Sequence, residues 1–319
     1  MKTTVVIPNF NGKIYLNACL ESLQGAAEGE YAVLVVDNGS SDKSAEEAAE
    51  RFPWLEMVSF PENRGFCAAV NEGIRRCRTP YVFLLNNDTV VRPGALAALE
   101  RRMDADPALF SLSACMVEMA DPARMDGAGD LYSALGWAYA LGKGKPAERF
   151  RDFRYVFSAC AGAALYRMEY LAVTGLFDEA HFAYLEDVDL GWRGRILGYR
   201  NGFEPAAVVL HAGSGSTGSR YNAFKITHSA RNNIYLLYKN MPAVQLLLNL
   251  PFLLAGFGIK ALFFARRGFG GLYLKALGEG LGMCRTGEAK KKKIRFKWNR
   301  LGYYSKIQLE LWLNLFRRF

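Results

Sequence analysis

Tyr81-Val82-Phe83-Leu84-Leu85-Asn86-Asn87-Asp88-Thr89 is the stretch that determines the predicted fold. Its five apolar residues predict a buried strand, and the polar residues after them predict the exit of that strand from a sheet. Asp37 and His211 follow two other short apolar runs in the same way. Because ligands bind outside the carboxyl ends of strands in open α/β sheets, these side chains predict one shared site.

The first 120 residues alternate between strand-like and helical patterns. Such alternation predicts an α/β fold in which helices flank a mostly parallel, Rossmann-like sheet. The predicted strands are 4–7, 32–36, 55–60, 81–85 and 109–116, and the predicted helices are 14–24, 43–51, 66–76 and 93–103. Irregular, acceptor-facing structure is expected over 120–152, where Gly, Pro and charged residues interrupt the pattern.

Composition limits the class of protein. With 319 residues, 51% of them hydrophobic, the chain can bury a large core and is neither disordered nor collagen-like. Its six cysteines are scattered without a C-x-x-C pair, which favours reduced thiols in a cytosolic compartment. The first residues lack the pattern of a secretory signal, so we expect the protein to stay inside the cell.

The net charge of +9 is concentrated in residues 290–319, which hold ten Lys and Arg against Glu310 alone. Residues 1–289 therefore carry no net charge. Aromatic and aliphatic residues are interleaved with these cations, which favours contact with an anionic membrane surface. A solvated basic tail is the main alternative. Nucleic acid is not an expected partner, because no nucleic-acid motif accompanies the charge.

Residues 243–265 form a long apolar stretch that Gln245, Asn249, Pro251 and Lys260 interrupt. We expect a helical segment that lies in the membrane plane or forms a homo-oligomer, and favour this over a membrane span. The chain is thus predicted to divide into a catalytic domain, 1–240, and a helical, basic, membrane-associating or oligomerising region, 241–319.

Two groups of residues predict the chemistry. Asp88 can hold a hard divalent cation, Mg²⁺ or Mn²⁺, against a diphosphate, and His211 can add a nitrogen ligand, although a histidine after a strand is more often structural. Glu186 and Asp187 open a predicted helix, where the helix dipole alone would favour them. Near a metal site, such a carboxylate can take the proton of an acceptor hydroxyl that attacks a sugar, with inversion.

Six motifs together resemble family 2 glycosyltransferases of the GT-A fold, and they occur in that family's order. They are Val6–Gly12, Val36–Asp42, Glu62–Phe66 with Asn71, Leu85–Thr89, Gly175–Glu179 and Glu186–Leu190. The resemblance spans residues 3–240 and is strongest to the rhamnosyltransferase-like branch, which builds bacterial cell-surface polysaccharides from dTDP-L-rhamnose.

The resemblance implies roles for individual residues. Asp187 would be the base, next to Glu186, and Asp88 and His211 would hold the metal. Asn86 replaces the first acid of the family's Asp-x-Asp motif and would face the nucleotide. The other residues implied in nucleotide binding are Pro8, Asn9, Asn11, Asp37, Asn63, Arg64 and Asn71. The Gln-x-x-Arg-Trp element of processive synthases is missing, so we expect one or a few sugars per acceptor.

The predicted activity is inverting transfer from a nucleotide-sugar donor to a lipid-linked or glycan acceptor. The protein would be cytoplasmic and peripheral at the inner face of the cell membrane. Three alternatives remain open. The donor is a UDP-sugar of galactofuranose, glucose or N-acetylglucosamine, or the protein is a nucleotidyltransferase with a weak phosphate loop at Asn9–Lys13, or it is a non-catalytic scaffold.

Overall fold

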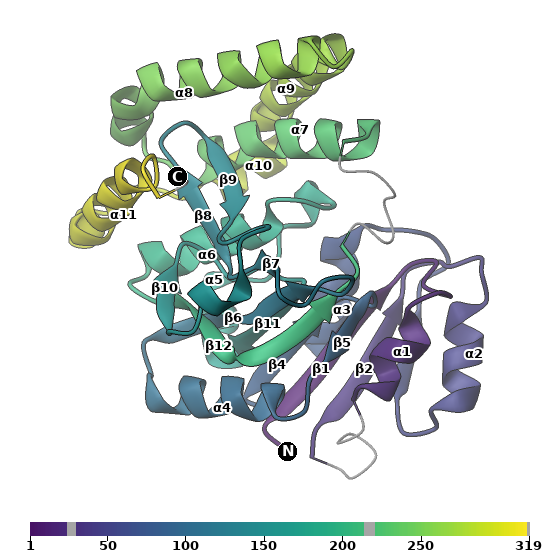
Figure 1. The fold of residues 1–319 in the computed structure, drawn as a ribbon. Coiled ribbons are helices and arrows are strands. Elements are labelled where there is room, and N and C mark those ends of the chain that lie inside the picture. The colour runs from purple at the N-terminus through teal and green to yellow at the C-terminus, as the bar shows by residue number, and fades with distance from the viewer. Residues whose placement is uncertain (24–29, 214–220, 318–319) are drawn as a thin grey trace.

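A large sheet with helices on both faces forms the body of the molecule, and a group of C-terminal helices packs at one end of it (Figure 1). The computed structural model describes residues 1–23, 30–213 and 221–317. The strands of the sheet are, in spatial order, β10 (Arg154–Val156), β12 (Arg200–His211), β6 (Leu109–Glu118), β11 (Ala163–Arg167), β4 (Tyr81–Leu85), β1 (Thr3–Asn9), β2 (Ala32–Asp37) and β3 (Glu56–Ser59).

The predicted α/β class is confirmed. Strand β1 pairs in parallel with β2 and β4, and β6 pairs in parallel with β12, while β11 runs antiparallel between β4 and β6. Two short strands, β5 (Thr89–Val91) and β7 (Met125–Gly127), pair antiparallel with β12 and β6. The carboxyl ends of β1, β2 and β4 therefore meet at one edge.

Alternate residues of β1 face the two halves of the core. Val5 and Ile7 pack in one cluster with α1 (Leu16–Glu21), α2 (Ser44–Arg51) and α4 (Ala95–Ala105). Val6 packs in the other with α3 (Phe66–Arg76), α5 (Met168–Thr174) and α6 (Glu186–Ile196). Burial on both faces explains why the predicted strands are nearly continuous apolar runs. The last residue of the predicted helix 14–24, Gln24, lies outside the described residues.

The prediction of irregular structure over 120–152 was wrong. This part contains β7 and a hairpin of β8 (Asp130–Ser133) and β9 (Trp137–Ala140), followed by a short 3₁₀ helix, η2 (Ala147–Arg149). Leu131 and Tyr132 are buried against Trp192 of α6. Their tertiary burial outweighs the local Gly and charge content that suggested a loop.

The described part of residues 241–319 is helical, as predicted. Its elements are α8 (Ala243–Ala265), α9 (Gly270–Arg285), α10 (Gly287–Lys292), η4 (Trp298–Arg300) and α11 (Leu301–Leu313). Helix α7 (Ala223–Asn240), which was not predicted, precedes them, and a 3₁₀ turn, η3 (Glu179–His181), precedes α6. Ile307 and Leu311 of α11 share a core cluster with Trp192. The basic region is therefore folded onto the body rather than extended as a solvated tail.

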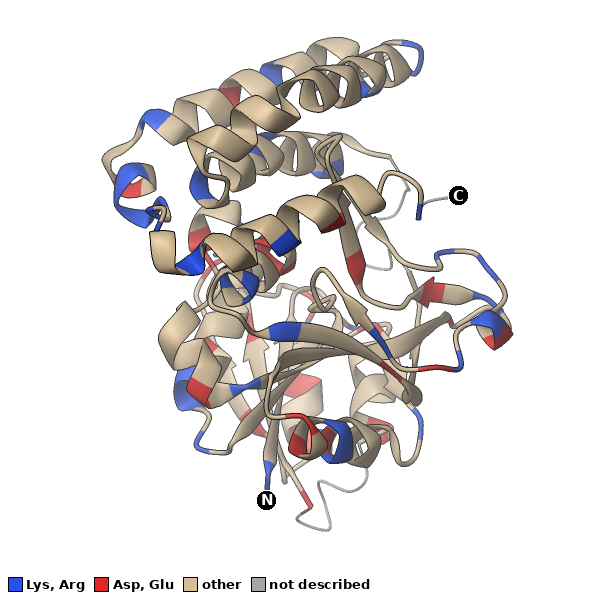
Figure 2. Ribbon diagram, turned by 90° about the vertical axis from the view of Figure 1, so that its left-hand side faces the viewer, with Lys and Arg blue, Asp and Glu red and all other residues tan. Residues whose placement is uncertain are grey.

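Helix α8 turns its polar side inward and its apolar side outward. Gln245 donates to the carbonyl of Tyr304 at 2.9 Å, and Asn249 and Gln308 exchange hydrogen bonds of 2.8 and 2.9 Å. Leu247 is 70% exposed, whereas Asn249 is fully buried. Among the described residues, α8 is the one helix whose length and composition would allow it to cross a membrane. The helix carries almost no charge (Figure 2).

Candidate active site

A cavity of about 700 Å³ opens at the carboxyl ends of β1 and β4. It is lined by eight of the residues that the sequence predicts for the site, namely Pro8, Asn9, Asn63, Asn86, Asp88, Glu186, Asp187 and His211. Four others are not among its lining residues: Asn11, Asp37, Arg64 and Asn71. The fold thus brings the predicted metal ligands and the predicted base to one space.

Asp37 lies behind the cavity wall and is 5% exposed. It accepts hydrogen bonds from Asn9 Nδ2 at 2.9 Å and from the Ser40 amide and hydroxyl at 3.1 and 2.6 Å. Asn9 in turn accepts a hydrogen bond from Asn87 at 2.8 Å. A Cβ at Gly12 would lie 2.1 Å from Asn9 Oδ1, so glycine is required there. These contacts hold the ends of β1, β2 and β4 together.

Asn63 and Arg64 belong to a second polar turn. Asn38, which the sequence analysis missed, lines the cavity, donates to Asn63 at 3.0 Å and accepts from the Arg64 amide at 2.9 Å. The guanidinium of Arg64 lies over the Phe60 ring, 4.8 Å from its centroid. Asn11 accepts from the Ser41 amide at 2.9 Å, outside the cavity.

Asn71 is buried below the cavity. Its amide donates to the carbonyl of Phe177 at 2.9 Å and accepts from the amide of the same residue at 3.0 Å. It also donates to Glu179 at 3.0 Å. Asn71 therefore fixes the segment before α6 against α3.

Asp88 and His211 approach each other on the cavity wall. His211 Nε2 lies 3.2 Å from Asp88 Oδ1, and its Nδ1 lies 2.8 Å from Asp126 Oδ2. Asp126 also contacts Lys143. Burial lowers the pKa of His211, but hydrogen bonds to Asp126 and Asp88 outweigh it and raise the pKa to about 9.

This donor set fits a divalent cation. One carboxylate oxygen and one imidazole nitrogen are suitable ligands for Mn²⁺ or Mg²⁺. Asp126 on the far nitrogen of His211 is the typical carboxylate that orients a metal-bound imidazole. Since cation and proton compete for His211, ligation would require its deprotonation.

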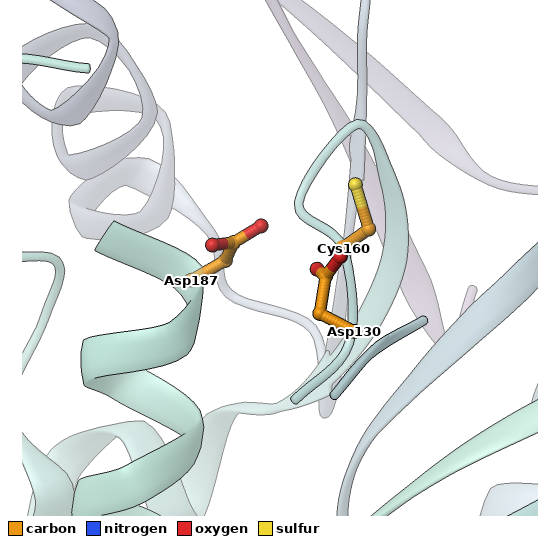
Figure 3. Close-up of side chains that lie close together, drawn as sticks. All are labelled: Asp130, Cys160 and Asp187. Carbon is orange, nitrogen blue, oxygen red and sulfur yellow. The ribbon is translucent and has the colours of Figure 1, made fainter. Parts of the chain in front are cut away.

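Asp187 lies beside a second acid that the sequence analysis missed. Carboxylate oxygens of Asp130 and Asp187 and the thiol of Cys160 lie within 4.8 Å of one another (Figure 3). Burial and the nearby Asp187 raise the pKa of Asp130 well above its usual range. Burial also raises the pKa of Asp187, but the amides of Val188 at 2.7 Å and Ala161 at 3.3 Å oppose this. The amide donors thus favour ionisation of Asp187 over ionisation of Asp130.

Glu186 is more enclosed than Asp187. Its Oε2 has no hydrogen-bond partner among the described residues. Burial, followed by the charge of Asp187, raises the pKa of Glu186 well above its usual range. Burial therefore favours the protonated form of Glu186.

Residues 4–174 match the model of the family "Glycosyl transferase family 2". The chain belongs to this family. A curated N-acetylglucosaminyl-diphospho-decaprenol L-rhamnosyltransferase of Mycobacterium tuberculosis is 28% identical over 265 residues, which cover 73% of this chain and 83% of that protein. This similarity supports the rhamnosyltransferase-like branch.

Solved structures confirm the GT-A fold of this glycosyltransferase. S. aureus TarS 1–349 in complex with UDP superposes with a TM-score of 0.58 at 15% identity, covering 98% of this chain and 89% of that 1–349 chain. GalNAc-T7 with UDP, GalNAc and Mn²⁺ gives a TM-score of 0.59 at 14% identity, covering 75% of this chain and 48% of that protein. At these identities the likeness concerns the fold alone.

The glycosyltransferase holds the start of α6 in an unusual backbone. Phe182, Tyr184 and Leu185 have φ of 63°, 72° and 68°, the left-handed region that larger side chains rarely adopt. A Cβ at Gly65 would lie 2.6 Å from the Phe182 ring, so a glycine allows this loop to approach α3. Such residues cost about 1–3 kcal/mol each and persist where packing over-determines them. Here they present Glu186 and Asp187 to the cavity.

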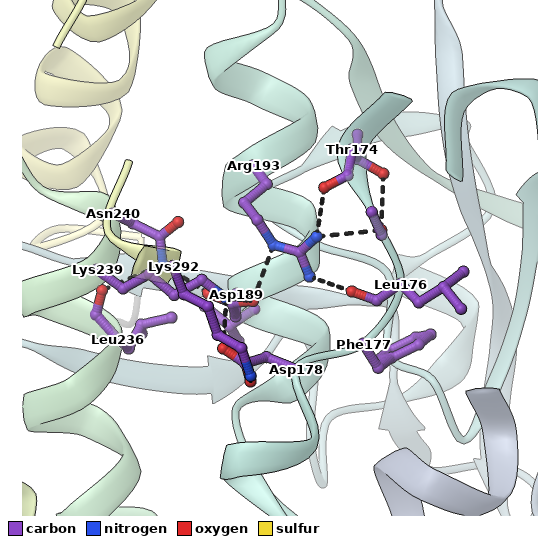
Figure 4. A network of polar contacts seen from close by, with 12 residues as sticks. Thr174, Leu176, Phe177, Asp178, Asp189, Arg193, Leu236, Lys239, Asn240 and Lys292 are labelled. Carbon is purple, nitrogen blue, oxygen red and sulfur yellow. Dashed lines mark hydrogen bonds and ion pairs between the residues drawn. The ribbon is translucent and has the colours of Figure 1, made fainter. Parts of the chain in front are cut away.

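Asp189, the third acid of α6, points away from the site. It accepts from Arg193 and Lys239 at 2.9 Å and from Asn240 at 2.7 Å (Figure 4). Burial opposes ionisation, but Lys239 and Arg193 outweigh it and hold the pKa of Asp189 below its usual range. Lys239 also contacts Asp178 at 2.7 Å. The network therefore anchors α6 of the glycosyltransferase to α7.

Asp126 and Asp130 had one available signal. They flank three small residues in Asp126-Gly127-Ala128-Gly129-Asp130, between apolar Met125 and Leu131. Two acids in a glycine-rich turn next to short apolar runs resemble the strand exits that the sequence analysis used. Because irregular structure was expected over 120–152, neither acid was predicted as a site residue.

Proposed function

We propose that this glycosyltransferase transfers a sugar with inversion from a nucleotide-sugar, with dTDP-L-rhamnose as the preferred donor, to a lipid-linked or glycan acceptor in cell-surface polysaccharide synthesis. The observation that carries the proposal is the single cavity lined by Asp187, Asp88 and His211. The similarity to a rhamnosyltransferase whose name includes a diphospho-decaprenol acceptor supports this choice of donor and acceptor.

The donor would lie along the β1 and β4 edge. Pro8, Asn9, Asn63 and Asn86 would contact the nucleotide directly. Asp37, Asn11, Arg64 and Asn71 would act by fixing the turns that carry those contacts. Asp88 and His211 would hold Mg²⁺ or Mn²⁺, which neutralises charge on the diphosphate leaving group.

Asp187 is the proposed catalytic base. It takes the proton of the acceptor hydroxyl as that oxygen bonds to the anomeric carbon, while the bond from this carbon to the diphosphate oxygen breaks. One displacement inverts the configuration and releases a nucleoside diphosphate. The amide donors to Asp187, together with the raised pKa values of Asp130 and Glu186, support its role as the ionised member of the group.

We also propose a division of labour between residues 1–240, which carry catalysis, and residues 241–319, which attach the enzyme to the inner face of the membrane. The outward apolar side of α8 and the cations of residues 290–300 support this attachment. A homo-oligomer that covers α8 is the alternative occupant of the same surface.

Calorimetric binding of dTDP, UDP, GDP and CMP, with and without Mn²⁺ or Mg²⁺, tests the donor. We expect metal-dependent binding with preference for dTDP. Preference for UDP would move the donor to a UDP-sugar, as the fold shared with a UDP complex allows. Absence of binding to any nucleotide would contradict a catalytic role and favour the scaffold alternative.

The variant Asp187→Asn tests the base. With a dTDP-rhamnose donor and a prenyl-diphosphate-linked N-acetylglucosamine acceptor, we expect kcat to fall by about 10²–10⁴-fold, the usual contribution of a general base. Nucleotide affinity should stay the same, because Asp187 does not contact the donor in this assignment. Unchanged turnover would refute the assignment.

A further inference from the structure

A second chamber of about 440 Å³ adjoins the catalytic cavity. The two spaces share the lining residues Ala138, Tyr139, Tyr184 and Ser229. Two of these residues, Ala138 and Tyr139, belong to β9, so this strand lines both spaces. A molecule in the second chamber could therefore extend into the cavity that holds Asp187.

The walls of the second chamber combine aromatic rings with cations. Phe263 and Phe264 of α8 and Tyr273 of α9 form an apolar side. Lys225 and Lys260 also line it, and Lys260 Nζ lies 5.8 Å from the centroid of the Trp137 ring. None of the described residues that line this chamber is Asp or Glu. This composition complements an anion attached to an apolar chain.

The apolar side of the chamber continues to the molecular surface. Ile259 lines the chamber and is 54% exposed, and the nearby Leu262 is 55% exposed. Both belong to the outward apolar side of α8. A chain that leaves the chamber past Ile259 would thus meet the surface that we assign to the membrane.

We propose that the second chamber binds the diphosphate and first isoprene units of a polyprenyl-diphosphate-linked acceptor, whose sugar enters the catalytic cavity. Lys225 and Lys260 contact the diphosphate, and Phe263, Phe264 and Ile259 contact the prenyl chain. This inference rests on the proposed function and adds to it the place where the lipid diphosphate binds and the residues that hold it.

Farnesyl diphosphate, a short prenyl diphosphate, is the probe for the test. We expect the full chain to bind it in calorimetry, and to bind farnesol and inorganic pyrophosphate much more weakly, because each lacks half of the recognised chemistry. Lys225→Gln and Lys260→Gln should each weaken farnesyl diphosphate binding by about tenfold, the usual effect of losing a contact to a charged group. Lys275→Gln is the matched control, since Lys275 is exposed on α9 outside the chamber.

Phe263→Ala provides a variant that leaves the charges unchanged. It should reduce the advantage of farnesyl over geranyl diphosphate, since it removes part of the wall that contacts the chain. In turnover assays the lysine variants should raise the KM for a prenyl-linked acceptor and leave the KM for the donor unchanged.

The outcomes separate this inference from the proposed function. Normal nucleotide binding together with unchanged farnesyl diphosphate affinity in both lysine variants would overturn the inference and leave the function intact. Equal competition by phosphatidylglycerol vesicles would also overturn it, because the chamber would then be a general lipid-phosphate site. Loss of nucleotide binding in the unmodified chain would contradict the proposed function itself.

Discussion

At the scale of single residues, the site depends on which of several close acids keeps a proton. Asp130, Glu186 and Asp187 are close together, and like charges at such separations do not all ionise. The amides of Val188 and Ala161 favour ionisation of Asp187. Asp130 then acts as a neutral neighbour that can donate toward Asp187.

Two substitutions of Asp130 distinguish its capacity to donate a hydrogen bond from its capacity to carry a charge. Asp130→Asn keeps a neutral donor, so we expect the acid limb of the kcat profile to stay within a few tenths of a pH unit. Asp130→Leu removes the donor, which favours the protonated form of Asp187. The acid limb of the kcat profile of this variant should move to higher pH by about one unit. That shift corresponds to the free energy of one charge-assisted hydrogen bond. Identical profiles for the two variants would contradict this role.

His181 should make the fold sensitive to acid. It is fully buried, its ring nitrogens have no hydrogen-bond partner among the described residues, and burial lowers its pKa to about 4. The folded state therefore binds fewer protons than the unfolded state between pH 6.5 and about 4. Its stabilising effect is complete above pH 6.5 and is lost as the pH falls.

The variant His181→Leu should flatten this dependence. We expect chemical denaturation of the parent protein to show roughly 3 kcal/mol less stability at pH 4 than at pH 7 from this residue. The variant should not show this decrease in stability between pH 7 and pH 4. An equally steep decline in both proteins would assign the acid sensitivity to other groups.

The place of some residues in the site could be predicted from the sequence, because these residues follow apolar runs that are typical of a buried strand. Asp88 after β4 and His211 at the end of β12 are of this kind. Asp126 and Asp130 could not be found in the same way. They enter the site through β7, which packs Met125 against the core, and through the β8–β9 hairpin, whose Tyr132 packs on Trp192. These contacts join residues distant in sequence.

At the scale of elements, α8 illustrates what local pattern does not determine. Gln245 and Asn249 interrupt an apolar stretch, and their polarity argues against a membrane span. Their spacing of four residues places them on one side of a helix. Only the tertiary structure shows that this side faces Gln308 and Tyr304. The helix itself was predictable, but its orientation was not.

Because α8 buries polar side chains and exposes apolar ones, mutation of its polar residues should reduce stability more than mutation of its apolar residues. Asn249→Ala should destabilise the protein by about 1–3 kcal/mol, because it leaves Gln308 buried without a partner. Leu247→Ala, at a 70% exposed position of the same helix, should change stability by less than about 0.5 kcal/mol. Urea denaturation in detergent measures both. A larger loss from the leucine variant would show that another surface covers this side of α8.

At the scale of the whole molecule, the C-terminal helices cannot be removed without damage to the core. Tyr304 and Leu311 share a cluster with Trp192 of α6, and Lys292 contacts Asp178 at 2.8 Å. A truncation after Lys239 would remove these contacts and uncover the core. Loss of membrane binding by the truncated protein could then result from misfolding. Charge reversal at exposed positions is the cleaner test.

Lys290→Glu with Lys297→Glu should weaken binding to anionic vesicles at low salt by at least about 2 kcal/mol, since each cation near such a surface contributes about 1 kcal/mol. Arg92→Glu with Arg101→Glu is the matched control. These arginines are exposed at and near α4, which lies away from the C-terminal helices (Figure 1). Vesicle flotation measures both proteins. Equal losses in the two double variants would refute a specific membrane face.

The inverted helix α8 also bears on the synthesis of the chain. Every strand of the large sheet precedes it in sequence, so the sheet can fold before α8 leaves the ribosome. A helix with an apolar exterior would aggregate if it emerged first, without a body to bind its polar side. Because α8 is made after all of these strands, a folded body is already present to bind its polar side when it emerges. The order of synthesis thereby shortens the time that the buried amides of α8 spend without their partners.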